Sequence, residues 1–336
     1  MVTPEGNPGD NLVRPTLMEL MSAAVQPAST ENFAQFSGLL FQRLRPNAVI
    51  SLPAEIEDRI AGGNTLILPW PHISLMDVPI VVGTAGLNRP HDGRNPGQDE
   101  KSSPLTRAVV IKSPGPLMPP GSLGVWWNPR HALETLRTGV PENQFATIGN
   151  FVLNSLMSGG IVLGEKRRSG MNTRMIEEAT DHLIRGGNVI LWPSGTFMIG
   201  DWRKGAARMI LHYIKHNHSD PLNIVYAHLA TFPGSVVNGL IRKAKYPIVV
   251  DYQHGPSAEE FLQFTDGIDF NSTADSIAAA EGALGHLRVT FRAQMHGFLG
   301  KVRGAYADVV SGFNQDIDKR YRRIRSFYDL IGDIEP

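Results

Sequence analysis

The stretch 66-LILPWPHISLMDVPIVV-82 sets a histidine and an aspartate between two apolar runs. The first run, residues 65–68, has the composition of a buried strand. We expect it to end at Pro69-Trp70-Pro71, because proline cannot donate to a strand ladder. His72 then lies in a turn, and Asp77 follows five positions later. Polar groups between buried segments are costly unless they are hydrogen-bonded, so the stretch predicts an interacting polar pair at a strand end.

The chemistry of the pair suggests a general base and the group that orients it. Imidazole titrates near neutrality and can accept and return a proton, while a carboxylate within hydrogen-bond reach fixes its tautomer. If a helix begins near residue 74, Asp77 turns back toward His72. The alternative is that Ser74-x-x-Asp77 forms a capping-box-like pattern, with Asp77 serving only as a first-turn acid. Among the eleven histidines, only His72 has an aspartate at this spacing.

Composition narrows the class of protein. With 336 residues and 42% hydrophobic content, the chain can build one large domain or two small ones. The net charge is zero, which argues against nucleic-acid binding through bulk charge. There are no cysteines, which excludes disulfides, thiolate metal sites and a cysteine nucleophile. Neither a signal peptide nor an apolar run of spanning length is evident, and we expect a cytoplasmic protein, with peripheral contact on the inner membrane face as an extension.

The second half of the chain alternates helices and strands. We expect helices at 151–157, 172–185 and 205–216, and strands at 160–163, 188–192 and 223–229, with Gly186-Gly187 closing the second helix. This alternation predicts an α/β fold with a mainly parallel mixed sheet and helices on both faces. Ligands bind such sheets at the carboxyl ends of the strands, where the polar turns of this chain fall.

The flanking regions are expected to be a small helical N-terminal region, 1–58, and a basic C-terminal helix, 301–336, around an α/β domain, 59–300. Helices are expected at 16–26, 31–45, 130–137, 273–284 and 302–331, and further strands at 107–112, 246–252 and 287–293. The run Lys319-Arg320-Tyr321-Arg322-Arg323-Ile324-Arg325 is either a solvated face or a surface attracted to anionic lipid.

Four blocks of sequence, in order, resemble those of the glycerolipid acyltransferase family with its His-x4-Asp motif. They are His72 to Asp77 with Ser74, Gly160-Ile161-Val162-Leu163-Gly164-Glu165-Lys166, Trp192-Pro193-Ser194-Gly195-Thr196 followed by Arg203-Lys204-Gly205-Ala206, and, more loosely, residues 223–229.

The resemblance implies transfer of a fatty acyl group from acyl-CoA or acyl carrier protein to a hydroxyl of glycerol-3-phosphate or a lysophospholipid. It implies that His72 is the base and Asp77 its orienter, with no metal and no cofactor beyond the acyl thioester co-substrate. Backbone N–H groups near Gly195 and Thr196 would stabilise the oxyanion. The substrate-binding residues implied are Ser74, Lys166, Arg167, Arg168, Ser194, Gly195, Thr196 and Lys204, of which the three consecutive basic residues would clamp an acceptor phosphate.

The chain departs from the family pattern at three positions: Pro71 replaces the usual Asn, Ser194 the usual Glu, and Phe197 the usual Arg. The soluble plastid-type glycerol-3-phosphate acyltransferases are similar in having Pro-Ser-Gly at the third block. Two alternatives stay open. One is an acyltransferase acting on an acceptor without phosphate, such as an amino alcohol or a specialised metabolite. The other is a lipid-binding or scaffolding protein with a decayed site.

Overall fold

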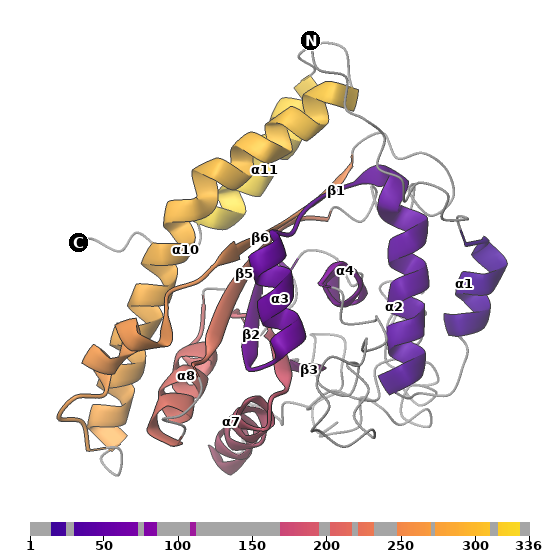
Figure 1. Cartoon of the computed structure of the whole chain (residues 1–336). Coiled ribbons are helices and arrows are strands. Elements are labelled where there is room, and N and C mark those ends of the chain that lie inside the picture. Colours follow the sequence, from indigo (N-terminus) through magenta and orange to yellow (C-terminus); the bar gives the residue numbers. More distant parts are fainter. Residues whose placement is uncertain are drawn as a thin grey trace, which may run out of the picture.

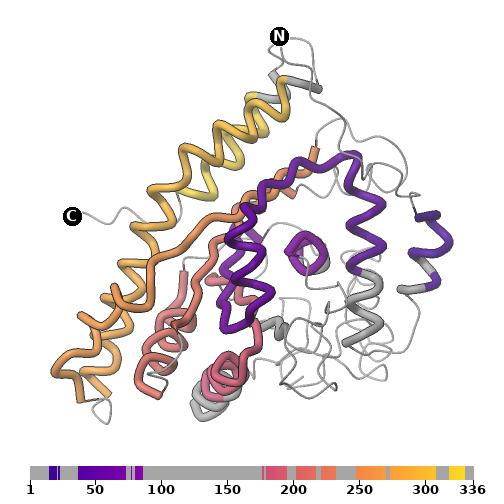
Figure 2. Tube along the Cα trace, viewed as in Figure 1, coloured from indigo at the N-terminus to yellow at the C-terminus, as the bar shows by residue number. Residues whose placement is uncertain are grey.

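The computed structural model describes residues 15–24, 30–72, 77–85, 108–111, 169–194, 202–216, 221–231, 247–269, 273–309 and 315–329. Figure 2 follows the chain through these segments, from indigo at the N-terminus to yellow at the C-terminus.

A mixed, mostly parallel sheet forms the centre of the fold, in the order β1-β6-β5-β2-β4-β3. β2 pairs in parallel with both β4 and β5, and β4 with β3, whereas β6 runs antiparallel to β5 and parallel to β1. The α/β class predicted from the sequence is therefore confirmed. The strands are β1 (Ala48–Ser51), β2 (Thr65–Trp70), β3 (Ala108–Ile111), β4 (Asn188–Leu191), β5 (Asn223–Ala230) and β6 (Ile248–His254).

Helices cover both faces of the sheet (Figure 1). Along β5, Ile224 and Tyr226 belong to the apolar cluster formed with α7, α8, α10 and α11, while Val225 and Ala227 belong to the cluster formed with α1 to α4. This alternation follows from the two-residue period of a strand. The helices are α1 (Leu17–Ala24), α2 (Thr30–Leu44), α3 (Ala54–Gly62), α4 (Asp77–Thr84), α7 (Ser169–Ile184), α8 (Gly205–His216), α10 (Thr273–Val309) and α11 (Gln315–Asp329), with short 3-10 helices η1 (Arg45–Asn47) and η3 (Ala258–Phe264).

The short helix α4 is fixed firmly against its neighbours. At its C-terminal end the Thr84 hydroxyl lies 2.6 Å from the Tyr252 hydroxyl, which also donates to the carbonyl of Val81 at 3.1 Å. A Cβ atom at Gly83 would lie 2.7 Å from the carbonyl oxygen of Ser37 on α2, so only glycine permits this close approach. Because α4 begins at Asp77, this packing also fixes the position of the aspartate.

One predicted strand is wrong, and two predicted helices have other bounds than expected. Residues 287–293 are not a strand, because α10 runs without a break from Thr273 to Val309. Leu287, Val289 and Phe291 alternate as in a strand, but their burial follows a helix. Leu287 and Phe291 are buried one turn apart, whereas Val289 is 53% exposed. The helices expected at 273–284 and 302–331 also differ in their bounds. The first, α10, continues to Val309, and α11 follows over Gln315–Asp329.

The prolines after residue 68 do not end β2, which continues through Pro69 to Trp70 in register with β5. The pairing of β2 with β4 reaches only Ile67. Pro69 therefore lies where β2 has a single partner strand, and a missing N–H is tolerated at such a position.

The other predicted elements within the described residues are found, including the strand near 107–112 and a C-cap glycine, Gly186, with a φ of 83°. The boundary expected at 58 falls within α3, and β1, which precedes it, is an edge strand of the sheet. The boundary expected at 300 falls within α10. The helices expected at 130–137 and 151–157 and the strand at 160–163 lie outside the described residues.

Candidate active site

His72 and Asp77 form the contact that their spacing predicts. His72 follows the end of β2, directly after a cis Trp70–Pro71 peptide bond, and its Nδ1 lies 3.0 Å from Oδ2 of Asp77. The His72 side chain is 14% exposed and that of Asp77 is fully buried. Asp77 is also the first residue of α4, where the helix dipole favours a negative charge, so its place in the first turn and its contact with His72 coexist.

A third residue, Thr231, holds the same carboxylate. Its hydroxyl donates to Oδ1 of Asp77, while Nδ1 of His72 bonds to Oδ2. Thr231 is fully buried and follows the end of β5, the strand beside β2. The sequence analysis missed it, since 154 positions separate it from Asp77. The available signal was that a polar residue directly after a buried parallel strand lies at the edge where ligands bind.

Trp192 packs against the histidine ring from the other neighbouring strand. It follows β4 directly, and its ring centroid lies 4.7 Å from that of His72, with 31° between the ring planes. Because β5, β2 and β4 are parallel neighbours, Thr231, His72 and Trp192 all come from carboxyl ends at one edge of the sheet. The predicted location of the polar turns at this edge is therefore confirmed for these strands.

The structure describes two further residues expected at the site. Ser194 is fully buried two positions after Trp192. Lys204 is half-exposed and forms an ion pair with Glu281 of α10. The loop that bears Lys204 is tied to the end of β4, since the Arg203 N–H donates to the carbonyl of Pro193 at 2.8 Å. The remaining expected residues, Ser74, Lys166, Arg167, Arg168, Gly195 and Thr196, lie outside the described residues.

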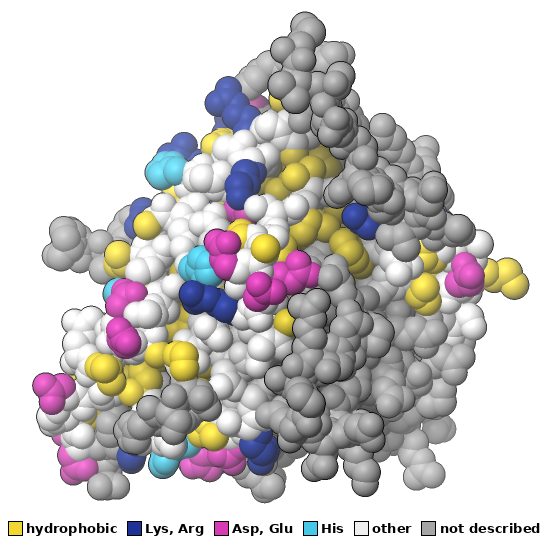
Figure 3. Space-filling view, viewed as in Figure 1, with side chains coloured by type: hydrophobic (Ala, Val, Ile, Leu, Met, Phe, Trp, Pro, Cys, Tyr) yellow, Lys and Arg dark blue, Asp and Glu magenta, His cyan; other side chains and the backbone are white. Residues whose placement is uncertain are grey.

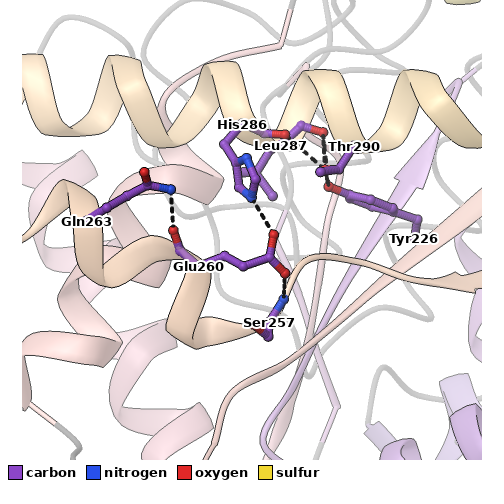
Figure 4. Close-up of polar contacts among 7 residues, drawn as sticks. All are labelled: Tyr226, Ser257, Glu260, Gln263, His286, Leu287 and Thr290. Carbon is purple, nitrogen blue, oxygen red and sulfur yellow. Dashed lines mark hydrogen bonds and ion pairs between the residues drawn. The ribbon is translucent and has the colours of Figure 1, made fainter.

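A second histidine–carboxylate pair has a different place in the fold. Nε2 of His286 on α10 lies 2.9 Å from Oε2 of Glu260 on η3 (Figure 4). The backbone N–H of Ser257 donates to the other oxygen of Glu260 and lowers the pKa of that carboxyl. Gly255, just before η3, donates to the carbonyl of Ile224 near the start of β5, so this pair lies at the opposite end of the parallel strands. It fastens η3 to α10 and is remote from His72.

His228 is fully buried on the face of β5 that meets α10 and α11. Its Nδ1 lies 3.0 Å from the Tyr328 hydroxyl and its Nε2 3.2 Å from Oε1 of Gln294. The Gln294 amide donates to the carbonyl of His254 at 2.7 Å, which directs its oxygen toward His228. Burial lowers the pKa of His228 to about 4, so the ring is neutral near pH 7. We infer a structural role for His228, which joins both C-terminal helices to the sheet.

Four further observations concern membranes, metal ions and surface charge. None of the helices in the described part of the chain is both long and apolar enough to cross a membrane. Among the described residues, no group of three or more His, Asp or Glu side chains is arranged to hold a metal ion. On the face drawn in Figure 3, basic and acidic side chains are interspersed. On α11, Arg322 and Arg323 are exposed while Phe327 and Tyr328 are buried, so both interpretations of the basic run stay open.

No family model matches the chain, and no curated protein matches it either. The interpretation of the site therefore depends on its geometry and on the sequence motifs.

Proposed function

We propose that the chain is an O-acyltransferase that moves a fatty acyl group from an acyl thioester to a hydroxyl of a glycerophosphate or lysophospholipid acceptor. The observation that carries the proposal is the 3.0 Å contact between His72 and a fully buried Asp77 at the carboxyl edge of a parallel sheet. A buried carboxylate beside a partly exposed imidazole matches the arrangement of a general base and its orienter.

Each group has one chemical task in this proposal. Asp77 accepts a hydrogen bond from the Nδ1–H of His72, which leaves Nε2 as the nitrogen that takes the proton of the acceptor hydroxyl. The hydroxyl oxygen attacks the thioester carbonyl carbon, a C–O bond forms, and the carbonyl electron pair moves to its oxygen. When the intermediate collapses, the C–S bond breaks and the protonated His72 returns the proton to the leaving thiolate. Thr231 holds Asp77 so that the imidazole keeps this tautomer.

The second candidate is an acyltransferase whose acceptor carries no phosphate. The ion pair between Lys204 and Glu281 favours it, since the charge of that lysine is already balanced within the protein. A phosphate at Lys204 would have to compete with the carboxylate. The two candidates share the donor and the base, and they differ only in the acceptor.

The decisive experiment measures thiol release from palmitoyl-CoA and palmitoyl-acyl carrier protein. Acceptors would be glycerol-3-phosphate, a lysophosphatidate and an unphosphorylated amino alcohol. Because the protein has no cysteine, a thiol reagent reports product from the CoA donor without background from the enzyme. We expect His72→Ala to lower the rate by about a hundredfold to ten-thousandfold. Asp77→Asn should also be slow, although Asn still caps a helix and should preserve most of the stability.

His286→Ala is the matched control, since it removes another histidine–carboxylate pair that lies away from His72. It should transfer acyl groups at the wild-type rate. A His72→Ala protein with normal activity and an unchanged melting temperature would refute the base assignment. Tight binding of palmitoyl-CoA by the wild type, without turnover on any acceptor, would instead indicate a decayed lipid-binding site.

A further inference from the structure

Three buried tryptophans in the described part of the chain have indole N–H groups without a hydrogen-bond partner: Trp70, Trp192 and Trp202. A buried indole N–H usually finds an acceptor, and leaving one unpaired costs stability. Such orphan donors in a native protein therefore call for an explanation. Trp70 and Trp202 lie in the core on the α8 and α10 side of the sheet and touch each other edge to face, with ring centroids 6.2 Å apart.

Trp192 differs from the other two in its neighbour. It lies on the opposite face of the sheet, and its ring packs against the imidazole of His72 at 4.7 Å between centroids. The two rings are tilted by 31°, and the imidazole does not accept a hydrogen bond from the indole N–H. A group that reacts beside His72 therefore lies next to an indole whose N–H lacks an acceptor.

We propose that the Trp192 indole N–H donates a hydrogen bond to the carbonyl oxygen of the acyl group that reacts beside His72. As the acceptor oxygen attacks the carbonyl carbon, the electron pair of the C=O bond moves to this oxygen. A donor fixed in a dry site stabilises the developing charge without having to reorganise. The role rests on the proposed acyl transfer and adds a side-chain donor to the backbone N–H groups expected near Gly195 and Thr196.

The position of Trp192 suits a fixed donor. The residue follows β4 directly, is 3% exposed, and packs in the apolar cluster formed with α2, α3 and α4. The same cluster includes α4, whose first residue, Asp77, holds the imidazole of His72 in place. The donor and the base are thus held by neighbouring strands, β4 and β2, of one sheet.

The test removes the N–H and keeps an aromatic ring. Trp192→Phe should lower kcat for acyl transfer by about a hundredfold, as loss of one oxyanion donor does elsewhere, with little change in KM. Its melting temperature should stay near that of the wild type, because removal of an unsatisfied buried donor offsets the packing that is lost with the smaller ring. Trp202→Phe is the matched control, since it removes an equally buried orphan N–H that is not in contact with His72. It should keep the wild-type kcat.

A binding measurement separates this proposal from the proposed function. The probe is a ketone analogue of palmitoyl-CoA, in which a methylene group between sulfur and carbonyl prevents transfer. In the nitrogen–proton spectrum, the Trp192 indole signal, assigned by its absence in Trp192→Phe, should move downfield when the probe binds, while the Trp202 signal stays in place. If the wild type is active and Trp192→Phe equals it in kcat, only the Trp192 role is refuted. If no acyl donor is turned over, an unmoved Trp192 signal refutes the donor role as well, and a moved signal supports it as a carbonyl-binding contact.

Discussion

The buried His228 makes the stability of this protein depend on pH in a calculable way. Burial lowers its pKa from the ordinary 6.5 to about 4, with the Gln294 contact and the Asp251 charge opposing the shift. Between these two values the unfolded chain binds a proton that the folded protein rejects. The free energy of unfolding therefore rises with pH in this window. His228 costs no stability above pH 6.5, and the cost grows as the pH falls toward 4.

The size of the effect follows from the same two values. A shift of the pKa from 6.5 to about 4 lowers the free energy of unfolding by about 3 kcal/mol once His228 is protonated in both the folded and the unfolded state. About 2 kcal/mol of this is already lost at pH 5. His228→Gln is the comparison variant, because a neutral amide can still bond to the Tyr328 hydroxyl and to Gln294 but cannot titrate. The other ten histidines are common to both proteins, so their contributions cancel in the difference.

The assay is urea unfolding of both proteins at half-unit steps from pH 7.5 to 5. The free energy of unfolding of the wild type should fall by about 2 kcal/mol more than that of His228→Gln over this range. Two curves that stay parallel within about 0.5 kcal/mol would refute the inference that His228 is held neutral by burial. A shift of the wild-type His228 ring signals to the protonated position above pH 5 would refute it independently.

Two further predictions concern buried hydrogen bonds. Thr231→Val removes the donor to Asp77 with little change in volume and should slow acyl transfer by about tenfold to a hundredfold, because the imidazole loses its fixed orientation; a wild-type rate of thiol release would contradict a positioning role. Asn188→Ala removes the side chain that accepts from the Thr65 N–H at 3.2 Å and donates to the Ile60 carbonyl at 2.9 Å. It should lower the free energy of unfolding by about 2–3 kcal/mol in urea titrations, and a loss under about 0.5 kcal/mol would show that water replaces both bonds.

The local part of the site could be predicted from the sequence. His72 and Asp77 are five positions apart, at a strand end and a helix start, so their contact depends mainly on one turn of chain. The same holds for α7, β4, α8 and β5. Each is marked by the periodicity of its apolar residues within a short stretch of sequence, and a glycine marks the end of α7. The α/β class followed from the order of these elements.

Short apolar patterns were less decisive. Residues 287–293 alternate like a strand, and only the extension to Leu284 and Met295 along the buried side of α10 shows a helix. Pro69 could be placed in β2 only once the strand order showed that β2 has one neighbour at that point. In both cases the local preference was outweighed by packing between segments distant in the chain.

The sequence by itself determined that His72 and Asp77 can meet and that they stand at the end of a strand. Only the tertiary structure decided what surrounds them: Thr231 on Asp77, Trp192 against His72, and the neutral state of His228 under α10 and α11. The physical reason is that a contact within one turn of chain is encoded by spacing. The neighbours of a strand, in contrast, are set by the pairing order β5-β2-β4 and by burial, to which the whole chain contributes.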